Sequence, residues 1–164
     1  MLILGIDPGL AIVGFSLIEK SGNKFKVCDY GVIRTSSDLS CTERLNIINM
    51  KLQDMIKEYE PDEMAVEELF FNKNVKTAIK VGQARGVILL SGAQSKIPVS
   101  EYTPLQVKQA VVGYGRASKQ QVQQMVKSLL NLNEIPKPDD AADALAIAIC
   151  HGNSLGLNRN IAMS

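Results

Sequence analysis

The sequence predicts an α/β domain with a mixed five-stranded sheet, in which three antiparallel strands are followed by parallel strands and helices cover both faces. Two observations predict this class. Three strand-like runs follow one another between residues 2 and 35 with only short turns between them. From residue 40 onward, helical patterns alternate with short apolar runs, which is typical of parallel strands joined by helices.

The first three predicted strands form a meander. LILGID (2–7) is a short apolar run stopped by Pro8-Gly9, which indicates a buried strand. AIVGFSLIEK (11–20) follows after the tight turn and is the expected hairpin partner. KFKVCDYGVIRT (24–35) alternates between apolar and polar residues, as a third strand would.

The remainder of the chain alternates helices and strands. Apolar residues between positions 40 and 59 share one helical face, and Pro61 prevents that helix from continuing. A strand at 63–71, a long helix at 74–95 and a short strand at 97–102 are expected next. Thr103-Pro104 and Ser118 are residue types that begin helices, so they predict helices to about residues 112 and 130. The alanine-rich segment that begins PDDAAD predicts the last helix.

Length and composition indicate one domain, predicted at 1–153, followed by a flexible tail at 154–164. The chain has 164 residues, of which 46% are hydrophobic and 21% charged, an ordinary balance for a soluble protein. No apolar run reaches the roughly 20 residues of a membrane helix, so we expect a cytoplasmic protein without a membrane partner. Cys150 and His151 are adjacent but point about 100° apart on a helix, which favours a structural role for His151.

The charge distribution is uneven along the chain. Nine Lys or Arg residues and one acid, Glu101, lie between residues 69 and 133, a net charge of +8. The total of +1 leaves −7 for the remainder. This polarity suits a basic surface beside an acidic pocket, although segregation along the sequence need not survive folding.

Acidic residues occur where the predicted strands end and the last helix begins. Asp7 lies at the carboxyl end of the first strand, and Glu67 and Glu68 lie at the carboxyl end of the fourth. A right-handed crossover would make these strands parallel neighbours, and ligands of such sheets lie beyond the strand carboxyl ends. Asp140 and Asp143 share one face of the last helix. The topology therefore predicts a carboxylate cluster at one end of the sheet.

A cluster of this kind predicts a divalent-cation site. Crowded carboxylates either raise one another's pKa or bind a hard cation through oxygen, and Mg²⁺ suits a few carboxylates together with phosphate oxygens. Each acid also has a local explanation: Asp139 suits the positive end of a helix, Asp7 suits a turn, and one glutamate of the doublet can be solvated. Their common location favours the metal site.

Five motifs occur in order over nearly the whole chain: ILGIDPG, AVEELFF, KTAIKVGQARGVI, QVKQAVVGYG and DDAADALAIAI. Together they resemble the RuvC-type Holliday-junction resolvases. The resemblance implies a ribonuclease-H-like fold, a homodimer and dependence on Mg²⁺, for which Mn²⁺ substitutes; the chemistry of phosphodiester hydrolysis favours two ions per subunit. It also implies paired symmetric nicks in four-way DNA junctions during recombination and repair, with a branch-migration helicase as partner.

The resemblance also assigns roles to residues. Asp7, Glu67, Asp140 and Asp143 match the catalytic, metal-binding acids, and Lys108 and Lys119 match basic residues near the scissile phosphate. Phosphodiester hydrolysis needs an activated water and charge relief on the leaving oxygen, which two metals can supply. Lys119 is then expected to act in catalysis by stabilising the charge that develops on the phosphate.

A DNA-binding surface is predicted beside the acids. Lys73, Lys76 and Lys80 share one face of the long helix, which suits phosphate contacts, although a solvated lysine face is the commoner case. By the resemblance Phe70 is the base-stacking wedge, and Phe71 could share or take that role. The predicted DNA-binding set is Phe70, Phe71, Lys73, Lys76, Lys80, Lys108, Arg116 and Lys119.

The long helix also offers a dimer contact. Ala78, Gly82 and Gly86 recur every four residues, so another backbone can approach closely. Packing on the parent sheet alone is the alternative, whereas the resemblance favours a two-fold dimer.

Three other functions compete with the junction resolvase. An ATP-handling enzyme would need a second lobe, and the chain has no Walker-type glycine loop. A non-catalytic nucleic-acid-binding module would not need four acids at one sheet end. Another nuclease of the same fold, acting on RNA or an RNA–DNA hybrid, differs only in substrate.

Overall fold

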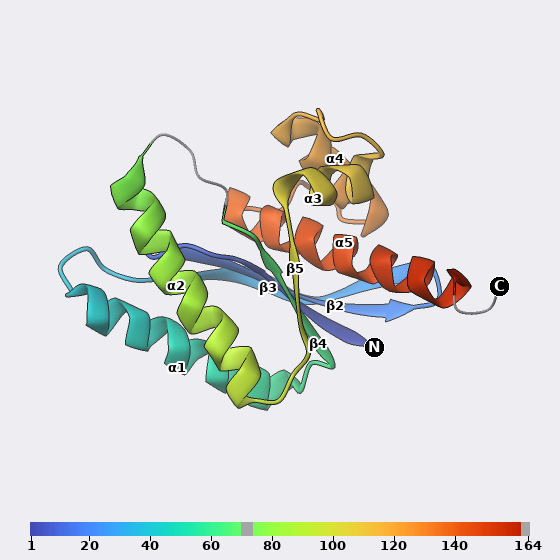
Figure 1. Ribbon diagram of the computed structural model, residues 1–164. Helices are drawn as coiled ribbons and strands as arrows, with labels where there is room; N and C mark the ends of the chain where they lie inside the picture. The colour runs from blue at the N-terminus through green and yellow to red at the C-terminus, as the bar shows by residue number, and fades with distance from the viewer. Residues whose placement is uncertain (70–73, 162–164) are drawn as a thin grey trace.

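Five strands form the centre of the molecule, in the order β3-β2-β1-β4-β5 across one sheet (Figure 1). The computed structural model describes residues 1–69 and 74–161, with side chains to residue 155. The strands are β1 (Leu2–Asp7), β2 (Ile12–Ser21), β3 (Lys24–Arg34), β4 (Glu63–Glu67) and β5 (Val99–Tyr102). β1, β2 and β3 pair antiparallel, whereas β4 runs parallel to both β1 and β5. The predicted mixed sheet is confirmed.

Helices cover both faces of this sheet. They are α1 (Cys41–Tyr59), α2 (Val75–Gln94), α3 (Pro104–Val112), α4 (Lys119–Leu129) and α5 (Asp139–Ile161). In Figure 1, α1 and α2 lie on one face and α5 lies on the other, with α3 and α4 beside it. Side chains alternate between the two faces along each strand, so Leu4 and Met64 pack with α1 and α2, whereas Ile3 and Ala65 pack with α5.

Three helices begin close to the predicted positions, with the caps expected at Thr103 and Ser118 and a further cap at Ser40. The side chains of Ser40, Thr103 and Ser118 each accept a hydrogen bond from a backbone N–H three residues on, and each forms a capping box. These signals are local, which is why the sequence alone located them.

Helix α5 lies unusually close to β1 and β2. A Cβ at Gly5 would collide with the carbonyl oxygen of Ala144, and one at Gly14 would collide with that of Asp140. The Ser16 hydroxyl donates to the Ala144 carbonyl oxygen at 2.8 Å. Small residues on both sides therefore let the main chain of α5 rest directly on the sheet.

The helical backbone of α5 continues to Ile161, past residue 153, where the predicted domain ends. That the chain is a single domain with a flexible tail stays a prediction. Among the helices in the described part of the chain, none combines the length and apolar character that crossing a membrane requires.

Candidate active site

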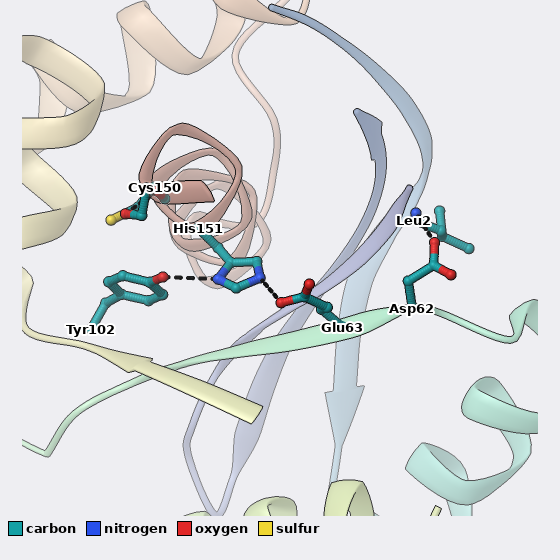
Figure 2. Close-up of polar contacts among 7 residues, drawn as sticks. Leu2, Asp62, Glu63, Tyr102, Cys150 and His151 are labelled. Carbon is teal, nitrogen blue, oxygen red and sulfur yellow. Dashed lines mark hydrogen bonds and ion pairs between the residues drawn. The ribbon is translucent and has the colours of Figure 1, made fainter. Parts of the chain in front are cut away.

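The register of β1 and β4 brings two predicted acids to one edge of the sheet. Ile6 lies opposite Val66 in the parallel pair, and Asp7 and Glu67 are the next residues of the two strands. At the far end of the pair, the Asp62 carboxylate accepts a hydrogen bond from the Leu2 N–H at 2.7 Å (Figure 2). This contact helps fix the register that sets Asp7 beside Glu67.

The amino end of α5 meets the same edge. Asp7 pairs with Gly14 on β2, and the main chain of Asp140 rests on Gly14. Asp143 follows one helical turn later and is partly buried. β1, β4 and α5 thus bring Asp7, Glu67, Asp140 and Asp143 to the same edge of the sheet.

Burial and mutual repulsion raise the pKa values of Asp7, Glu67 and Asp143. Burial, reinforced by the charges of Glu67, Asp143 and Asp140, raises the pKa of Asp7 to about 8. Burial and the charge of Asp143 raise the pKa of Glu67 to about 7. The pKa of Asp143 is also raised, chiefly by burial, although Lys119 opposes the change. The fold therefore holds acids together at a free-energy cost, which is typical of a functional site.

The structure separates the two glutamates of the doublet. Consecutive strand residues point to opposite faces, and Glu67 is the one whose charge acts on Asp7. Glu68 is exposed, and its backbone N–H donates to the Tyr102 carbonyl oxygen at 2.8 Å. Glu67 therefore belongs to the cluster and Glu68 faces solvent.

Lys119 brings a positive charge to the cluster. Its Nζ donates to Asp143 Oδ2 at 3.0 Å and lies 3.3 Å from Asp139 Oδ2. Burial works to lower the pKa of Lys119, but the contacts with Asp143 and Asp139 outweigh it and raise that pKa. Asp139 also accepts a hydrogen bond from Gln123 at 3.1 Å. The sequence explained Asp139 by the positive end of its helix alone, whereas the structure gives it two side-chain partners on α4.

A cavity of about 240 Å³ opens beside these groups. Its lining combines Glu67 and Asp143 with Lys108 of α3 and Lys119 of α4. Apolar side chains of α3, α4 and α5 complete the wall. An acidic floor with two lysines beside it can receive a cation and a phosphate together.

The acids fit a divalent cation in their chemistry. All are hard oxygen ligands, and the raised pKa values of Asp7 and Glu67 reflect burial and the repulsion of neighbouring carboxylates, both of which a bound cation would offset. As the side chains stand, no three Asp, Glu, Cys or His residues within 1–69 and 74–161 are close enough together to hold one ion. The fit therefore rests on the donor set and its electrostatics.

Comparison with known proteins decides the family. The family model described as Crossover junction endodeoxyribonuclease RuvC matches residues 3–151. The chain belongs to this endodeoxyribonuclease family.

The similarity to RuvC proteins extends over nearly the whole chain. The RuvC of Halothermothrix orenii is 70% identical over 159 residues, which cover 97% of this chain and 96% of that protein. The solved Thermus thermophilus RuvC is 37% identical with a TM-score of 0.89, covering 96% of this chain and 97% of that one. Thermus thermophilus RuvC has also been solved in complex with a Holliday junction substrate, at 36% identity, a TM-score of 0.91 and 96% coverage of both chains. The fold of the chain is accordingly that of RuvC, a ribonuclease-H-like fold.

The predicted DNA-binding residues of this RuvC-family chain lie on several elements. Lys76 and Lys80 are exposed on α2, and Arg116 is exposed in the turn between α3 and α4. Lys108 is partly buried in the cavity wall. Three further predictions, Phe70, Phe71 and Lys73, fall outside the described residues.

Arg85 makes a contact near the site that the sequence did not predict. Arg85 Nε donates to the Glu67 carbonyl oxygen at 3.3 Å, and the Arg85 guanidinium forms an ion pair with Glu101 of β5. Arg85 thereby supports the end of β4 that carries Glu67. The sequence does contain a hint of this ion pair. Glu101 is the one acid among nine basic residues between positions 69 and 133, so a basic partner nearby was to be expected.

Proposed function

We propose that this RuvC-family endodeoxyribonuclease resolves four-way DNA junctions by paired symmetric nicks, through divalent-metal-assisted hydrolysis, in recombination and repair. The observation that carries the proposal is the convergence of Asp7, Glu67, Asp140 and Asp143 beside Lys119. The complex of Thermus thermophilus RuvC with a Holliday junction supports this substrate.

The four acids would hold Mg²⁺, with Mn²⁺ as a substitute and two ions in each subunit. When bound, such ions supply an activated water and neutralise charge on the leaving oxygen. Asp7 is within electrostatic reach of the other three acids, which supports a bridging role for its carboxylate. Because carboxylates bind cations in the ionised form, Asp7 and Glu67 release protons when the site is loaded.

Lys119 acts on the phosphate. Its ammonium lies at the rim of the cavity, paired with Asp143, and its raised pKa keeps it charged at neutral pH. Substrate phosphate competes for this ammonium, which then stabilises the negative charge that develops during hydrolysis. Lys108, across the same cavity, binds and orients the phosphate.

The exposed lysines of α2 bind the DNA backbone. Lys76 and Lys80 are exposed one turn apart and can contact successive phosphates. Lys73, the third lysine of the predicted set, would add a further phosphate contact. Arg116 adds a contact on the α3–α4 turn. Phe70 or Phe71 stacks on an unpaired base at the junction centre, which can contribute about 1–3 kcal/mol.

The working unit is a homodimer. Val75, Ile79 and Leu90 of α2 are 69%, 56% and 53% exposed, an apolar surface that a second subunit would cover. Gly86 lies along this helix with no atom within 4 Å of an added Cβ. A Gly86→Trp variant should therefore sediment as a monomer, and an unaltered dimer would exclude this face of α2 as the dimer contact.

The same proposal includes a branch-migration helicase as partner and a cytoplasmic location.

The doublet offers a matched test of the proposed reaction. Glu67→Gln should bind a four-way junction and fail to cut it with Mg²⁺, whereas Glu68→Gln, one residue away and exposed, should cut like the wild type. An RNA–DNA hybrid duplex serves as the competing substrate. Faster cutting of the hybrid than of the junction, or equal cutting by both variants, would contradict the proposal.

A further inference from the structure

The single histidine of the chain is buried and fully hydrogen-bonded. His151 on α5 is 1% exposed. Its Nδ1 lies 2.8 Å from the Tyr102 hydroxyl, and its Nε2 lies 2.8 Å from Glu63 Oε2. Figure 2 shows the imidazole between these two side chains, with β5 on one side and β4 on the other. One ring therefore joins three elements.

The network satisfies each of its members. With the proton on Nε2, the ring donates to the Glu63 carboxylate and accepts from the Tyr102 hydroxyl. Burial raises the pKa of Tyr102, which keeps its hydroxyl protonated and able to donate. The rings of Tyr102 and His151 also pack edge to face, with centroids 5.7 Å apart. Such a fully satisfied buried network fixes one geometry.

Each anchor of the network is tied to an acid of the active site. Glu63 lies on β4 four residues before Glu67, so both side chains are on the α5 face of the sheet. Tyr102 lies directly opposite Glu67 in the β4–β5 register. His151 lies two turns beyond Asp143 on the same helix face. The network therefore connects the helix that carries Asp143 to β4, which carries Glu67, and to its neighbour β5.

The other contacts of α5 with the sheet differ in kind. Between Ala141 and Ile149 its buried side chains are alanine, leucine and isoleucine, and such contacts have no preferred direction. The Ser16 hydrogen bond and the Gly5 and Gly14 contacts hold α5 to β1 and β2. His151 supplies directional bonds to β4 and β5, the half of the sheet that holds Glu67.

We propose that His151 is a positioning residue for DNA cleavage, which acts through Tyr102 and Glu63 to hold the Asp140–Asp143 end of α5 at a fixed distance from Glu67. The inference rests on the proposed function, because spacing of the acids matters only if they share metal and substrate. Shifts of about 1 Å at a reaction centre can reduce rates about 100-fold. Loss of the network should therefore reduce turnover and metal binding while leaving DNA affinity unchanged.

Removal of one hydroxyl tests this inference. Tyr102→Phe keeps the ring and deletes the bond to His151, and Tyr59→Phe is the matched control. Tyr59 likewise donates its hydroxyl to a side chain, here Asp29 Oδ2 at 3.1 Å, on the α1 side of the molecule. We expect Tyr102→Phe to lower kcat on a four-way junction about tenfold, with KM unchanged, and to weaken Mn²⁺ affinity in an electron paramagnetic resonance titration. Tyr59→Phe should match the wild type in both measurements.

A second variant, His151→Phe, removes both bonds at once and should show the larger loss of kcat and of Mn²⁺ affinity. Tyr102→Phe with wild-type kcat and Mn²⁺ affinity would overturn the inference, as would equal losses in Tyr59→Phe. Failure of the proposed function would look different from failure of this inference. If the proposed function is wrong, the wild type itself will not cut the junction, and its Mn²⁺ binding will not depend on Asp7.

Discussion

Replacing Asp7 by asparagine should stabilise the metal-free protein while abolishing cleavage. The pKa of Asp7 is about 8 in the folded chain, against an ordinary value of 3.8. The folded state therefore binds the Asp7 proton more tightly than the unfolded state does. Ionisation of this carboxyl opposes folding progressively as pH rises from about 4 to about 8, and asparagine cannot ionise.

The size of the effect follows from the same pKa values. Between 3.8 and pH 7, each pH unit corresponds to about 1.4 kcal/mol, which sets a ceiling of about 4 kcal/mol on the gain. Glu67 and Asp143 also take up protons as the site titrates, so we expect about 2 kcal/mol at pH 7. For a chain of this length, that gain corresponds to about 4–8 °C in Tm.

The assay is thermal unfolding with EDTA at pH 5 and pH 8, with and without excess Mg²⁺. The advantage of Asp7→Asn over the wild type should be small at pH 5 and large at pH 8. Added Mg²⁺ should raise the Tm of the wild type more than that of the variant, because a ligand stabilises the state that binds it. Asp54→Asn, a change of an exposed residue on α1, is the control and should leave Tm unchanged. An Asp7→Asn variant no more stable than the wild type at pH 8 in EDTA would refute the electrostatic reasoning.

Three further predictions follow from the geometry. Lys119→Met should lower kcat about 100-fold or more, with junction affinity little changed. The control Lys127→Met, at the far end of α4, should cut normally, and single-turnover kinetics will compare the two variants. Lys80→Gln should reduce the slope of log affinity against log salt by about one, measured by fluorescence anisotropy, and an unchanged slope would remove α2 from the DNA contact. Gly14→Ala should lower the free energy of unfolding in urea by about 2 kcal/mol or more, because its Cβ would collide with the Asp140 main chain.

Much of the fold could be predicted because its signals are local or follow from chain topology. Ser40, Thr103 and Ser118 mark helix starts through contacts three residues away. The parallel pairing of β1 and β4 follows from the right-handed crossover between them, and it brings Asp7 and Glu67 together.

The remaining features depend on side-chain directions that no short stretch of sequence specifies. Which glutamate of the doublet faces the cluster is set by the register of β4, and a shift of one residue would exchange Glu67 and Glu68. The histidine network joins Glu63, Tyr102 and His151, which are far apart along the chain, and its existence depends on how closely α5 approaches the sheet. The sequence therefore favoured a structural role for His151 but could not identify Tyr102 and Glu63 as its hydrogen-bond partners.

The contact between Gly14 and the main chain of Asp140 has a practical consequence for engineering. Because backbone atoms touch there, the main chain of that aspartate is positioned directly against β2 rather than through an intervening side chain. A mutational library that seeks altered sequence preference can randomise solvent-facing positions of α3 and α4, apart from Lys119, while Asp140 stays in place. Position 14 itself must be excluded from such a library, since every substitution there adds at least one carbon where no space exists.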